Sequence, residues 1–474
     1  MALDLQQKKH ADSRRDSHAS ALEPRYTFHA ADFHRKENKL GQVYTALARY
    51  LHKKRSSDWC PKTAASALLC DLIIGGNQAG GIEWRRLGSH GVKPLVNYCR
   101  GFQALTRKAL MAQSLRSYSL RMLHDTETSK ENIVGNAKSE VNGTAIKGDI
   151  NLDDFVPKTF IFSSKKQDRE EFVAEYARRR QQGLDNTWIL KPSGGAHGDN
   201  IVVMREEAEI LDFISNMTMR GAEWVVQKYL ENPLLLPGGR KFDIRCMVLV
   251  GHDYSIYLYS EGVLRTCSVT YSLEDLSNRF AHLANHCLQE QHPAYGSHAG
   301  EPDNLMPFSN FDSFLRQASA HTDRLVTLDT HILPQIEKQV VYSLLAVKDD
   351  MEVPESASYR SFHLLGFDFM LDDRFNVYLV EVNASPTTDP KFIPKLVEEV
   401  VRVAIDPLLP PQSTGLCGPE QATSDQVKAS RDEGAAEATP DLVEPSQGDG
   451  AVGTAAVGTG QVGSFKLLWK QKGC

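Results

Sequence analysis

Two carboxylates and an amide stand near the open end of a predicted β-hairpin, with a spacing that suits a metal site. The apolar runs GFDFML and VYLVEV flank a polar loop, which predicts two antiparallel strands. A four-residue loop over 373–376 would place Asp368 directly opposite Glu381. Glu381 and Asn383 are two residues apart on one strand, so their side chains project from the same face. We therefore expect three oxygen-bearing side chains to converge.

The chemistry that fits this group is binding of Mg²⁺. Two like charges side by side in a sheet are costly unless a cation lies between them. Mg²⁺ prefers a few carboxylates together with phosphate oxygens. The alternative is a pair of unrelated carboxylates on a solvated surface, but the residues that flank Asp368 and Glu381 are too apolar for such a surface. The pattern therefore predicts a magnesium site made of Asp368, Glu381 and Asn383.

A glycine-rich loop after a short strand is the second candidate for chemistry. Lys191 ends the run WILK, and the loop that follows contains Gly194, Gly195 and Gly198. Glycines let backbone N–H groups approach phosphate oxygens closely, and Lys191 could hold a phosphate as a point charge. The alternative is an ordinary turn. The pattern GxxxxGK[ST] is absent, so a P-loop nucleotidase is not indicated.

Charged residues also recur at alternate positions of a third strand. In KFDIR, alternation puts Lys241, Asp243 and Arg245 on one face, and Arg265 follows the next predicted hairpin. This pattern indicates a lined cleft, although an exposed sheet face would have the same alternation. The strand end 227–230 (QKYL) could hold an adenine edge, or it could be an ordinary strand end.

The elements that must position these residues alternate between strand and helix. Residues 246–250 and 255–260 predict a second hairpin. Apolar residues at helical spacing predict helices over 205–217, 333–346 and 394–406. The block is therefore expected to be α+β, with antiparallel sheet covered by helices on one face.

A chain of 474 residues is too long for one ordinary core, so two or three domains are expected. Polar and low-complexity stretches separate the blocks. Within the last stretch, residues 465–472 (FKLLWKQK) could dock as a short amphipathic piece, but a loose end is the favoured interpretation. The predicted organisation is a disordered N-terminal extension (1–24), a basic N-terminal domain (25–124), a flexible insertion or linker (125–154), the α+β block (155–410) and a disordered tail (411–474).

The window 84–124 contains no Asp or Glu. This composition predicts a positive surface that attracts an acidic partner, unless it is simply a helix with a solvated basic face. Few aromatic residues are interleaved, so nucleic acid is not favoured as the partner. The basic residues of the window are Arg85, Arg86, Lys93, Arg100, Arg107, Lys108, Arg116 and Arg121.

Composition also bears on the compartment. Residues 1–24 lack an apolar core of the kind that signal peptides have, and no run of 18 apolar residues predicts a membrane helix. The eight cysteines are scattered, without CxxC or Cys/His spacing, which is typical of a reduced cytoplasmic chain. Nothing in the sequence predicts an oligomer, and a monomer is expected.

Taken together, these segments resemble the tubulin tyrosine ligase family of the ATP-grasp superfamily. The resemblance runs from about Tyr26 to Pro411, apart from 125–154. It implies an ATP-grasp fold with a smaller N-terminal α/β domain for substrate recognition. The segments that carry it, in order, are WRRLGSHGVKPLVNYCRG (84–101), the Lys191 loop, VVQKYLENPLLL (225–236), RKFDIR (240–245), YLYSEGVLRT (257–266), HLANHCLQ (282–289), SFHLLGFDFM (361–370) and VEVNASP (380–386).

The resemblance also implies roles for the matching residues. Asp368, Glu381 and Asn383 would hold Mg²⁺. The basic residues that would contact phosphates or the acceptor carboxylate are Lys108, Lys191, Arg245 and Arg265, of which Lys191 and Arg245 would be catalytic with Glu381. The residues that would bind the adenine or ribose, or line the same cleft, are Gln227, Lys228, Leu230, Lys241, Asp243, His282 and Asn285.

The function that the resemblance implies is ATP-dependent ligation of free tyrosine to the C-terminal glutamate of detyrosinated α-tubulin, through an acyl phosphate. The partners would be the acidic tubulin tail and tyrosine. The location would be cytoplasmic, with association with the cytoskeleton. His286 follows Asn285 in HLANHC, which is similar to tyrosine ligases, whereas a tyrosine usually follows in the wider family.

Two residues depart from the family pattern. His197 stands in the glycine loop where the family usually has Lys or Arg, and Ala284 stands where it has Thr. Three alternatives remain open. They are a polyglutamylase or glycylase of the same family, an ATP-grasp ligase of small molecules, and a tubulin-binding protein with weak or no catalysis.

Overall fold

The computed structural model describes residues 24–31, 40–131, 151–164, 168–195, 198–412 and 461–471, with backbone only for 125–131. Helices and antiparallel sheets mix in these ranges, so the fold is α+β as predicted. Among the described helices, none combines the length and the apolar character that crossing a membrane requires. Nearly all of the predicted extension 1–24 and most of the predicted tail 411–474 lie outside the described residues.

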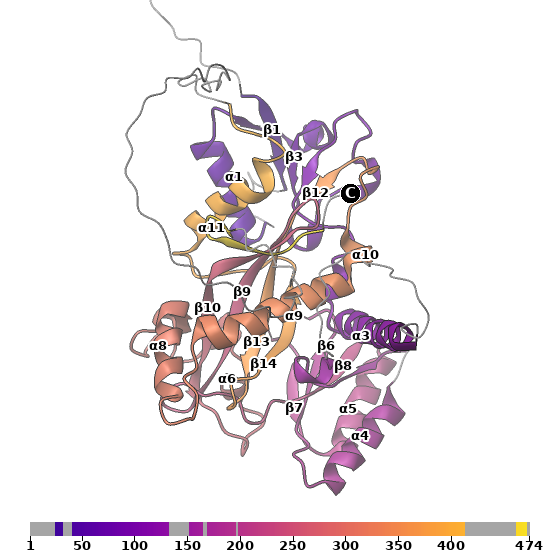
Figure 1. The fold of residues 1–474 in the computed structure, drawn as a ribbon, viewed down its shortest axis with the longest axis vertical. Coiled ribbons are helices and arrows are strands. Elements are labelled where there is room, and N and C mark those ends of the chain that lie inside the picture. Colours follow the sequence, from indigo (N-terminus) through magenta and orange to yellow (C-terminus); the bar gives the residue numbers. More distant parts are fainter. Residues whose placement is uncertain are drawn as a thin grey trace, which may run out of the picture.

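The N-terminal region builds a five-stranded sheet with the order β12-β4-β3-β1-β2. All its neighbouring strands are parallel, and α1 (Gln42–Lys54) lies beside α11 (Ile393–Val400) in this part of the molecule (Figure 1). One edge strand, β12, comes from far along the chain, so the sheet joins the N-terminal region to the later block. The strands are β1 (Tyr26–Ala30), β2 (Trp59–Pro61), β3 (Leu72–Ile74), β4 (Leu95–Val96) and β12 (Arg360–Ser361).

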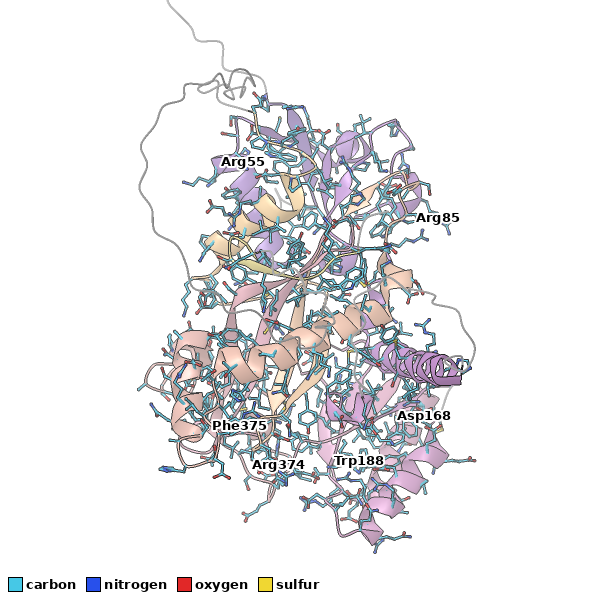
Figure 2. All side chains as sticks on the ribbon, in the orientation of Figure 1. Arg55, Arg85, Asp168, Trp188, Arg374 and Phe375 are labelled. Carbon is cyan, nitrogen blue, oxygen red and sulfur yellow. The ribbon has the colours of Figure 1, made fainter. Side chains whose placement is uncertain are left out.

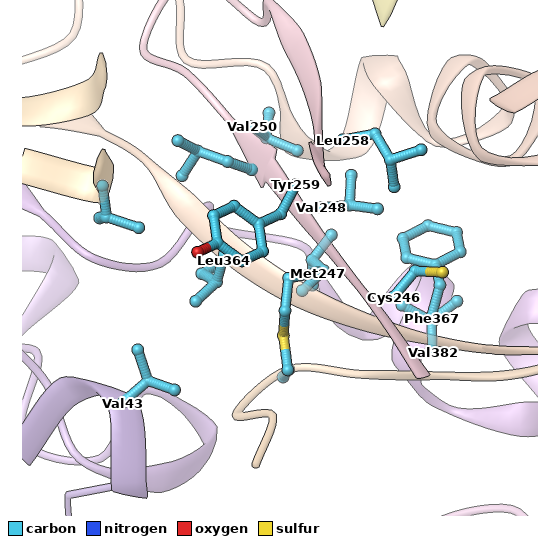
Figure 3. Packing of buried hydrophobic residues seen from close by; sticks show 14 of the residues in the cluster. Val43, Cys246, Met247, Val248, Val250, Leu258, Tyr259, Leu364, Phe367 and Val382 are labelled. Atoms are coloured by element: carbon cyan, nitrogen blue, oxygen red, sulfur yellow. The ribbon is translucent and has the colours of Figure 1, made fainter. Parts of the chain in front are cut away.

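The central sheet is antiparallel and has the order β14-β13-β9-β10-β16-β15, with β11 paired to β10. Helix α9 (Leu333–Ala346) lies across it and α8 (Phe308–Ala318) flanks β10 (Figure 1). Figure 3 shows Val248 and Leu364 of this sheet in one apolar cluster with Val43 of α1. The strands are β9 (Arg240–Val250), β10 (Ile256–Thr270), β11 (Leu305–Pro307), β13 (His363–Leu371), β14 (Val377–Asn383), β15 (Gln461–Val462) and β16 (Phe465–Trp469).

A third, four-stranded sheet has its own aromatic core. Its order is β5-β8-β6-β7, and every pair is antiparallel. Trp188, labelled in Figure 2, packs there edge-on against Phe172 of α4 and is buried. The elements are β5 (Thr159–Phe162), β6 (Trp188–Pro192), β7 (Val202–Met204), β8 (Trp224–Lys228), α4 (Arg169–Gln181) and α5 (Glu207–Met219).

Helix α3 (Lys108–Glu131) connects the four-stranded sheet with the central sheet. It contacts β5 and β8 of the former and α9, which packs against the latter. It continues beyond residue 124, so the first residues of the predicted flexible segment 125–154 are helical, and a short 3₁₀ turn, Leu152–Asp154, ends that segment. The remaining short helices are α2 (Gln103–Thr106), α6 (Arg279–His282), α7 (His286–Gln289) and α10 (Lys348–Met351).

The hairpin of β13 and β14 has the predicted pair but a different register at its turn. Asp368 lies opposite Glu381, as predicted. Near the turn, Val377 pairs with Leu371, one residue away from the predicted partner at 372. A β-bulge between Asp368 and Phe369 takes up the difference, because it leaves Val380 as an extra residue on β14.

The end of the chain forms a strand where the sequence favoured a loose tail. Strand β16 pairs antiparallel with β10, with Phe465 opposite Tyr259. The Phe465 side chain is fully buried, and Lys466 forms an ion pair with Glu337 of α9 at 2.7 Å. The physical reason lies in β10, whose outer edge would otherwise present unpaired backbone groups. The interpretation of 465–471 as part of a disordered tail is therefore corrected.

Replacing Phe465 with alanine should lower the free energy of unfolding by about 3 kcal/mol, the usual cost of emptying a buried aromatic site. The reason is that Phe465 fills a buried position against the ring of Tyr259, 5.1 Å away between centroids. Urea denaturation of the full chain measures the change. Lys470→Ala, which removes only an exposed ion pair with Asp253, is the control and should change stability by less than about 1 kcal/mol. Equal urea midpoints for Phe465→Ala and wild type would show that β16 contributes little.

Candidate active site

The described strands of the central and third sheets border a cleft with an empty volume of about 910 Å³. It lies where β6 and β8 face β9, β10, β13 and β14, so residues far apart in sequence meet there. The sequence-predicted residues that line it are Lys108, Lys191, Gln227, Lys228, Leu230, Lys241, Asp243, Arg265, His282, Asn285, Asp368 and Glu381. The other two predicted residues, Arg245 and Asn383, are not part of this lining, but both contact Asp368, which is.

The oxygen-bearing triad converges at one end of the cleft. The amide Nδ2 of Asn383 donates to Asp368 Oδ2 at 3.1 Å and to Glu381 Oε1 at 3.3 Å. A half-turn of that amide would present its oxygen to the same space. Among the described residues, no three His, Cys, Asp or Glu side chains group as metal ligands, so a cation here would take its third protein oxygen from Asn383. Two carboxylates and an amide oxygen suit a hard cation that keeps positions for water or phosphate.

Protein cations balance these carboxylates on the sheet itself. Arg245 lies directly opposite Asp368 and contacts both of its oxygens, one of them at 2.7 Å from Nη2. Arg265 forks onto Asp243 at 2.6 Å for both contacts and reaches Asp368 Oδ2 at 2.9 Å. The result is a fixed row of alternating charges, in which removal of one member leaves another buried and unpaired.

Glu381 faces two lysines from other elements. Lys108, the first residue of α3, places its Nζ 3.1 Å from Glu381 Oε2. Burial alone would raise the pKa of Glu381, but the ammonium groups of Lys108 and Lys191 and the guanidinium of Arg265 outweigh it, so its pKa lies well below the usual range. Glu381 is therefore ionised at neutral pH.

Three lysines on the cleft walls lose part of their basicity on burial. Burial lowers the pKa of Lys191 to about 7, with Glu381 opposing and Lys108 adding to the effect. Burial likewise lowers the pKa of Lys228 and of Lys241 to about 8. An anionic ligand would restore these charges, because opposite charge nearby favours the ammonium form.

Tyr229 belongs to the strand end 227–230 that the sequence indicated for adenine, but it was not among the predicted site residues. Its hydroxyl accepts a hydrogen bond from Lys241 Nζ at 2.8 Å. Its own proton can therefore point to His282 Nδ1, also 2.8 Å away, while His282 Nε2 donates to the carbonyl of Asp275. Burial lowers the pKa of His282, in keeping with this neutral ring. The chain of hydrogen bonds holds Lys241 in place at the cleft wall.

Two glycines of the glycine loop, Gly195 and Gly198, line the cleft. Gly198 has a φ of +77°, and a Cβ there would lie 2.8 Å from Asn285 Oδ1, so no other residue fits without a shift. The carbonyl of Gly195 accepts from Lys108 Nζ at 3.2 Å. His197 lies outside the described residues, and Ala284 is buried in the cleft lining.

Apolar side chains complete the lining, and the sequence did not single them out. Ile189 and Leu283 are examples from two different walls. Val380 and Tyr378 join Glu381 in the lining, although strict alternation would send Val380 to the opposite face from Glu381. The bulge in β14 explains this, because an extra residue re-aims the side chains that follow it. An apolar lining with a few polar groups is typical of a ligand site.

The basic window 84–124 divides between surface and cleft. Lys108 is buried in the cleft, and Arg116 forms an ion pair with Asp168, labelled in Figure 2, at 3.3 Å. The side chains exposed to solvent are Arg85, Arg86, Lys93, Arg100, Arg107 and Arg121. Six of the eight basic side chains are thus exposed, as a positive surface would require, whereas Lys108 is buried and Arg116 is partly buried.

This architecture, with antiparallel sheets that enclose a lysine-lined cleft ending in carboxylates, is that of the ATP-grasp class. The model of the Tubulin-tyrosine ligase family matches residues 91–414, and the chain belongs to that family. The fold and family predicted from the sequence are therefore confirmed.

The curated proteins that the chain resembles include several that are named tubulin glycylases. Tubulin glycylase 3C of Tetrahymena thermophila is 30% identical over 254 residues, which are 50% of this chain and 22% of the glycylase. A tubulin monoglycylase of Homo sapiens is 30% identical over 245 residues, which are 48% of this chain and 30% of that protein. The chain thus matches less than a third of the length of either relative.

Proposed function

We propose that the chain is an ATP- and Mg²⁺-dependent ligase that joins an amino acid to a carboxylate of a tubulin tail. The observation that carries this proposal is the meeting of Asp368, Glu381 and Asn383 with Lys108 and Lys191 at one end of a cleft. Carboxylates and an amide suit the metal of a metal–nucleotide complex, and buried ammonium groups suit its phosphates. Membership of the Tubulin-tyrosine ligase family supports the same reading.

Different parts of the cleft would bind the adenine and the phosphates of the nucleotide. The adenine would lie at the end of β8, against Gln227, Lys228 and Leu230 and the apolar Ile189. The phosphates would run toward the carboxylate end, where Lys191 is buried and Arg265 is held by Asp243 and Asp368. Mg²⁺, when bound by Asp368, Glu381 and Asn383, would neutralise charge on the phosphoryl oxygens.

The protein's own part in the reaction is positioning and electrostatics. Lys191 and Arg265 would stabilise the γ-phosphoryl group as it moves to the acceptor carboxylate. The resulting acyl phosphate reacts with the amino group of the incoming amino acid, which releases phosphate and forms a C–N bond. The apolar wall, including Leu283 and Val380, would keep water from hydrolysing that acyl phosphate.

The acceptor that matches the exposed basic residues is an acidic polypeptide. Exposed basic residues from 85 to 121 lie on the same part of the chain as Lys108, which enters the cleft. A positive surface steers an acidic chain toward such a cleft. A tubulin tail has this character, and cytoskeletal association in the cytoplasm would follow.

Tyrosine is the amino acid that we favour, with the C-terminal glutamate of detyrosinated α-tubulin as acceptor. The support is the HLANHC segment, in which Asn285 lines the cleft and His286 stacks edge-on with Tyr295 at 5.6 Å. Glycine is the second candidate, because relatives at 30% identity are named glycylases.

Incorporation of labelled amino acids tests the proposal. Carboxypeptidase-treated tubulin and Mg·ATP are incubated with the full chain and with tyrosine, glycine or glutamate in parallel. Incorporation of tyrosine alone supports tyrosine ligation, and incorporation of glycine or glutamate moves the chain to that other specificity. If no amino acid is incorporated while tubulin is bound, the chain is a binding protein on a ligase scaffold.

Nucleotide affinity should fall as the pH rises above about 7. The pKa of Lys191 is about 7 in the free protein, so above this pH its side chain is mostly a neutral amine, which must take up a proton before it can hold a phosphate as an ammonium group. One required proton weakens binding by up to about tenfold per pH unit. Titration calorimetry with ADP at pH 7.0 and 8.0, in two buffers of different ionisation enthalpy, measures affinity and proton uptake.

The control for this pH dependence is Lys191→Arg, since arginine stays charged throughout. Proton uptake between pH 7.0 and 8.0 should shrink in this variant, and the remainder belongs to Lys228 and Lys241. An ADP affinity in wild type that does not change between these pH values would contradict the assignment of Lys191 to a phosphate.

A further inference from the structure

We propose that Thr159 is a positioning residue, which fixes the amide of Gln227 and, through it, holds the ammonium group of Lys191 toward the nucleotide phosphates. The inference rests on the proposed function in one respect, namely that a nucleotide is the ligand of the cleft. Thr159 does not itself line the cleft among the described residues, so it would act only through Gln227.

The direction of each hydrogen bond follows from the donors available. Thr159 begins β5 and lies opposite Gln227 of β8. Its hydroxyl donates to the carbonyl of Pro157 at 2.7 Å. A hydroxyl has one proton, so toward Gln227 it can only accept, and it does so from Nε2 at 2.9 Å. An amide with its nitrogen on Thr159 must turn its oxygen the other way.

That oxygen is the acceptor for Lys191. The distance from Lys191 Nζ to Gln227 Oε1 is 2.8 Å. Without the hydroxyl, the amide could turn over and place its NH₂ group against the ammonium. Thr159, Gln227 and Lys191 are all at most 9% exposed, so little water is present to relieve that repulsion. The hydroxyl thus decides which way a buried amide faces, and the amide decides where a buried charge is held.

The position of Thr159 is itself secured from helix α3. Arg116 Nη2 donates to the carbonyl of Thr159 at 2.7 Å. The same arginine pairs with Asp168, which also accepts from the backbone N–H of Ile161. Strand β5 therefore cannot shift along β8 without breaking these bonds. The same contacts make loss of the hydroxyl a local change rather than a displacement of the strand.

The test compares Thr159→Val with Thr159→Ser in the full chain. Valine has nearly the shape of threonine and suits a strand, but it lacks the hydroxyl, whereas serine keeps it. We expect Thr159→Val to weaken ADP binding about tenfold, the scale of one buried hydrogen bond to a charged group. Adenosine, which has no phosphate, should lose clearly less affinity than ADP in Thr159→Val, because the turned amide of Gln227 still borders the adenine while only ADP also depends on Lys191. Thr159→Ser should retain ADP affinity close to that of wild type.

Thermal melting without ligand checks that each variant is folded, and Thr159→Ala replaces the valine variant if that one is not. ADP affinity in the hydroxyl-free variant equal to that of wild type overturns the inference. Equal losses in the valine and serine variants also overturn it, because packing and not the hydroxyl would then be responsible. Equal weakening of ADP and adenosine does the same, since Lys191 would not be the group affected.

Amino-acid incorporation by wild type, measured in parallel, separates this inference from the proposed function. Ligation by wild type with unchanged ADP binding in Thr159→Val overturns the role of Thr159 alone. Weakened ADP binding in Thr159→Val, with no ligation by wild type, supports the role of Thr159 and overturns the proposed ligase.

Discussion

Replacing Glu381 with glutamine is expected to lower the rate of amino-acid ligation on the order of 10³-fold and to leave tubulin binding intact. Removal of one preorganised charged group at a reacting centre commonly has an effect of this size. Glu381 is ionised at neutral pH, because Lys108, Lys191 and Arg265 hold its pKa well below the usual range. The neutral amide removes that charge from the end of the cleft while it keeps nearly the same shape.

The fold should tolerate this change. Glu381 and Asp368 are directly opposite like charges, so loss of one relieves repulsion, while Lys108 loses its partner at 3.1 Å. Labelled-amino-acid incorporation and tubulin co-sedimentation measure the two expected results. Glu398→Gln, which changes an exposed glutamate on α11, is the matched control and should behave as wild type. Ligation by Glu381→Gln within about tenfold of the wild-type rate would contradict the metal site proposed here.

Replacing Arg245 with leucine is expected to lower the free energy of unfolding by about 3–5 kcal/mol, the cost of breaking a buried ion pair by removal of one partner. Arg245 contacts both oxygens of Asp368, whose side chain is 1% exposed. Arg265 would remain as a charged partner through one contact at 2.9 Å, and the amide of Asn383 through one hydrogen bond at 3.1 Å. Ligation should be lost as well, because Asp368 would no longer be held toward Glu381 and Asn383.

Urea denaturation measures the stability of this variant, and Arg245→Lys should fall between it and wild type. Lysine keeps the charge but cannot make the forked contact. Arg316→Leu is the matched control, because its pair with Asp312 on α8 is exposed and should be worth less than about 1 kcal/mol. A leucine variant at position 245 as stable as wild type would mean that the charge row contributes nothing to the fold.

The hairpin of β13 and β14 shows which strand pairs could be predicted from the local sequence and which could not. The pair Asp368–Glu381 was predicted from alternation and a four-residue turn, and the pair is confirmed. The turn itself pairs Leu371 with Val377, so the predicted register was wrong there. The bulge that reconciles the two leaves no mark in the sequence pattern, because one extra residue in an apolar strand looks like any other.

For the basic window 84–124, the sequence did not show which basic side chains are exposed and which are buried. Its lack of acids predicted a positive surface, and six of its side chains are exposed. Lys108 and Arg116 lie in the same acid-free window, but their side chains form ion pairs with Glu381 and Asp168 instead of facing solvent fully. No local pattern separates these two residues from the others, since their partners are distant in sequence and are brought near only by the packing of α3 against β5 and β8.

The sequence by itself determined the residue types and the faces on which they lie. The period of two along KFDIR and VEVN, the glycines after Lys191 and the family resemblance are all local properties of the chain. The tertiary structure alone decided that these faces enclose one cleft, that Gln227 and Thr159 orient Lys191, and that β16 covers the edge of β10. The physical reason is that strand periodicity depends on neighbours two residues away, whereas each of these contacts depends on which strands pair across the whole chain.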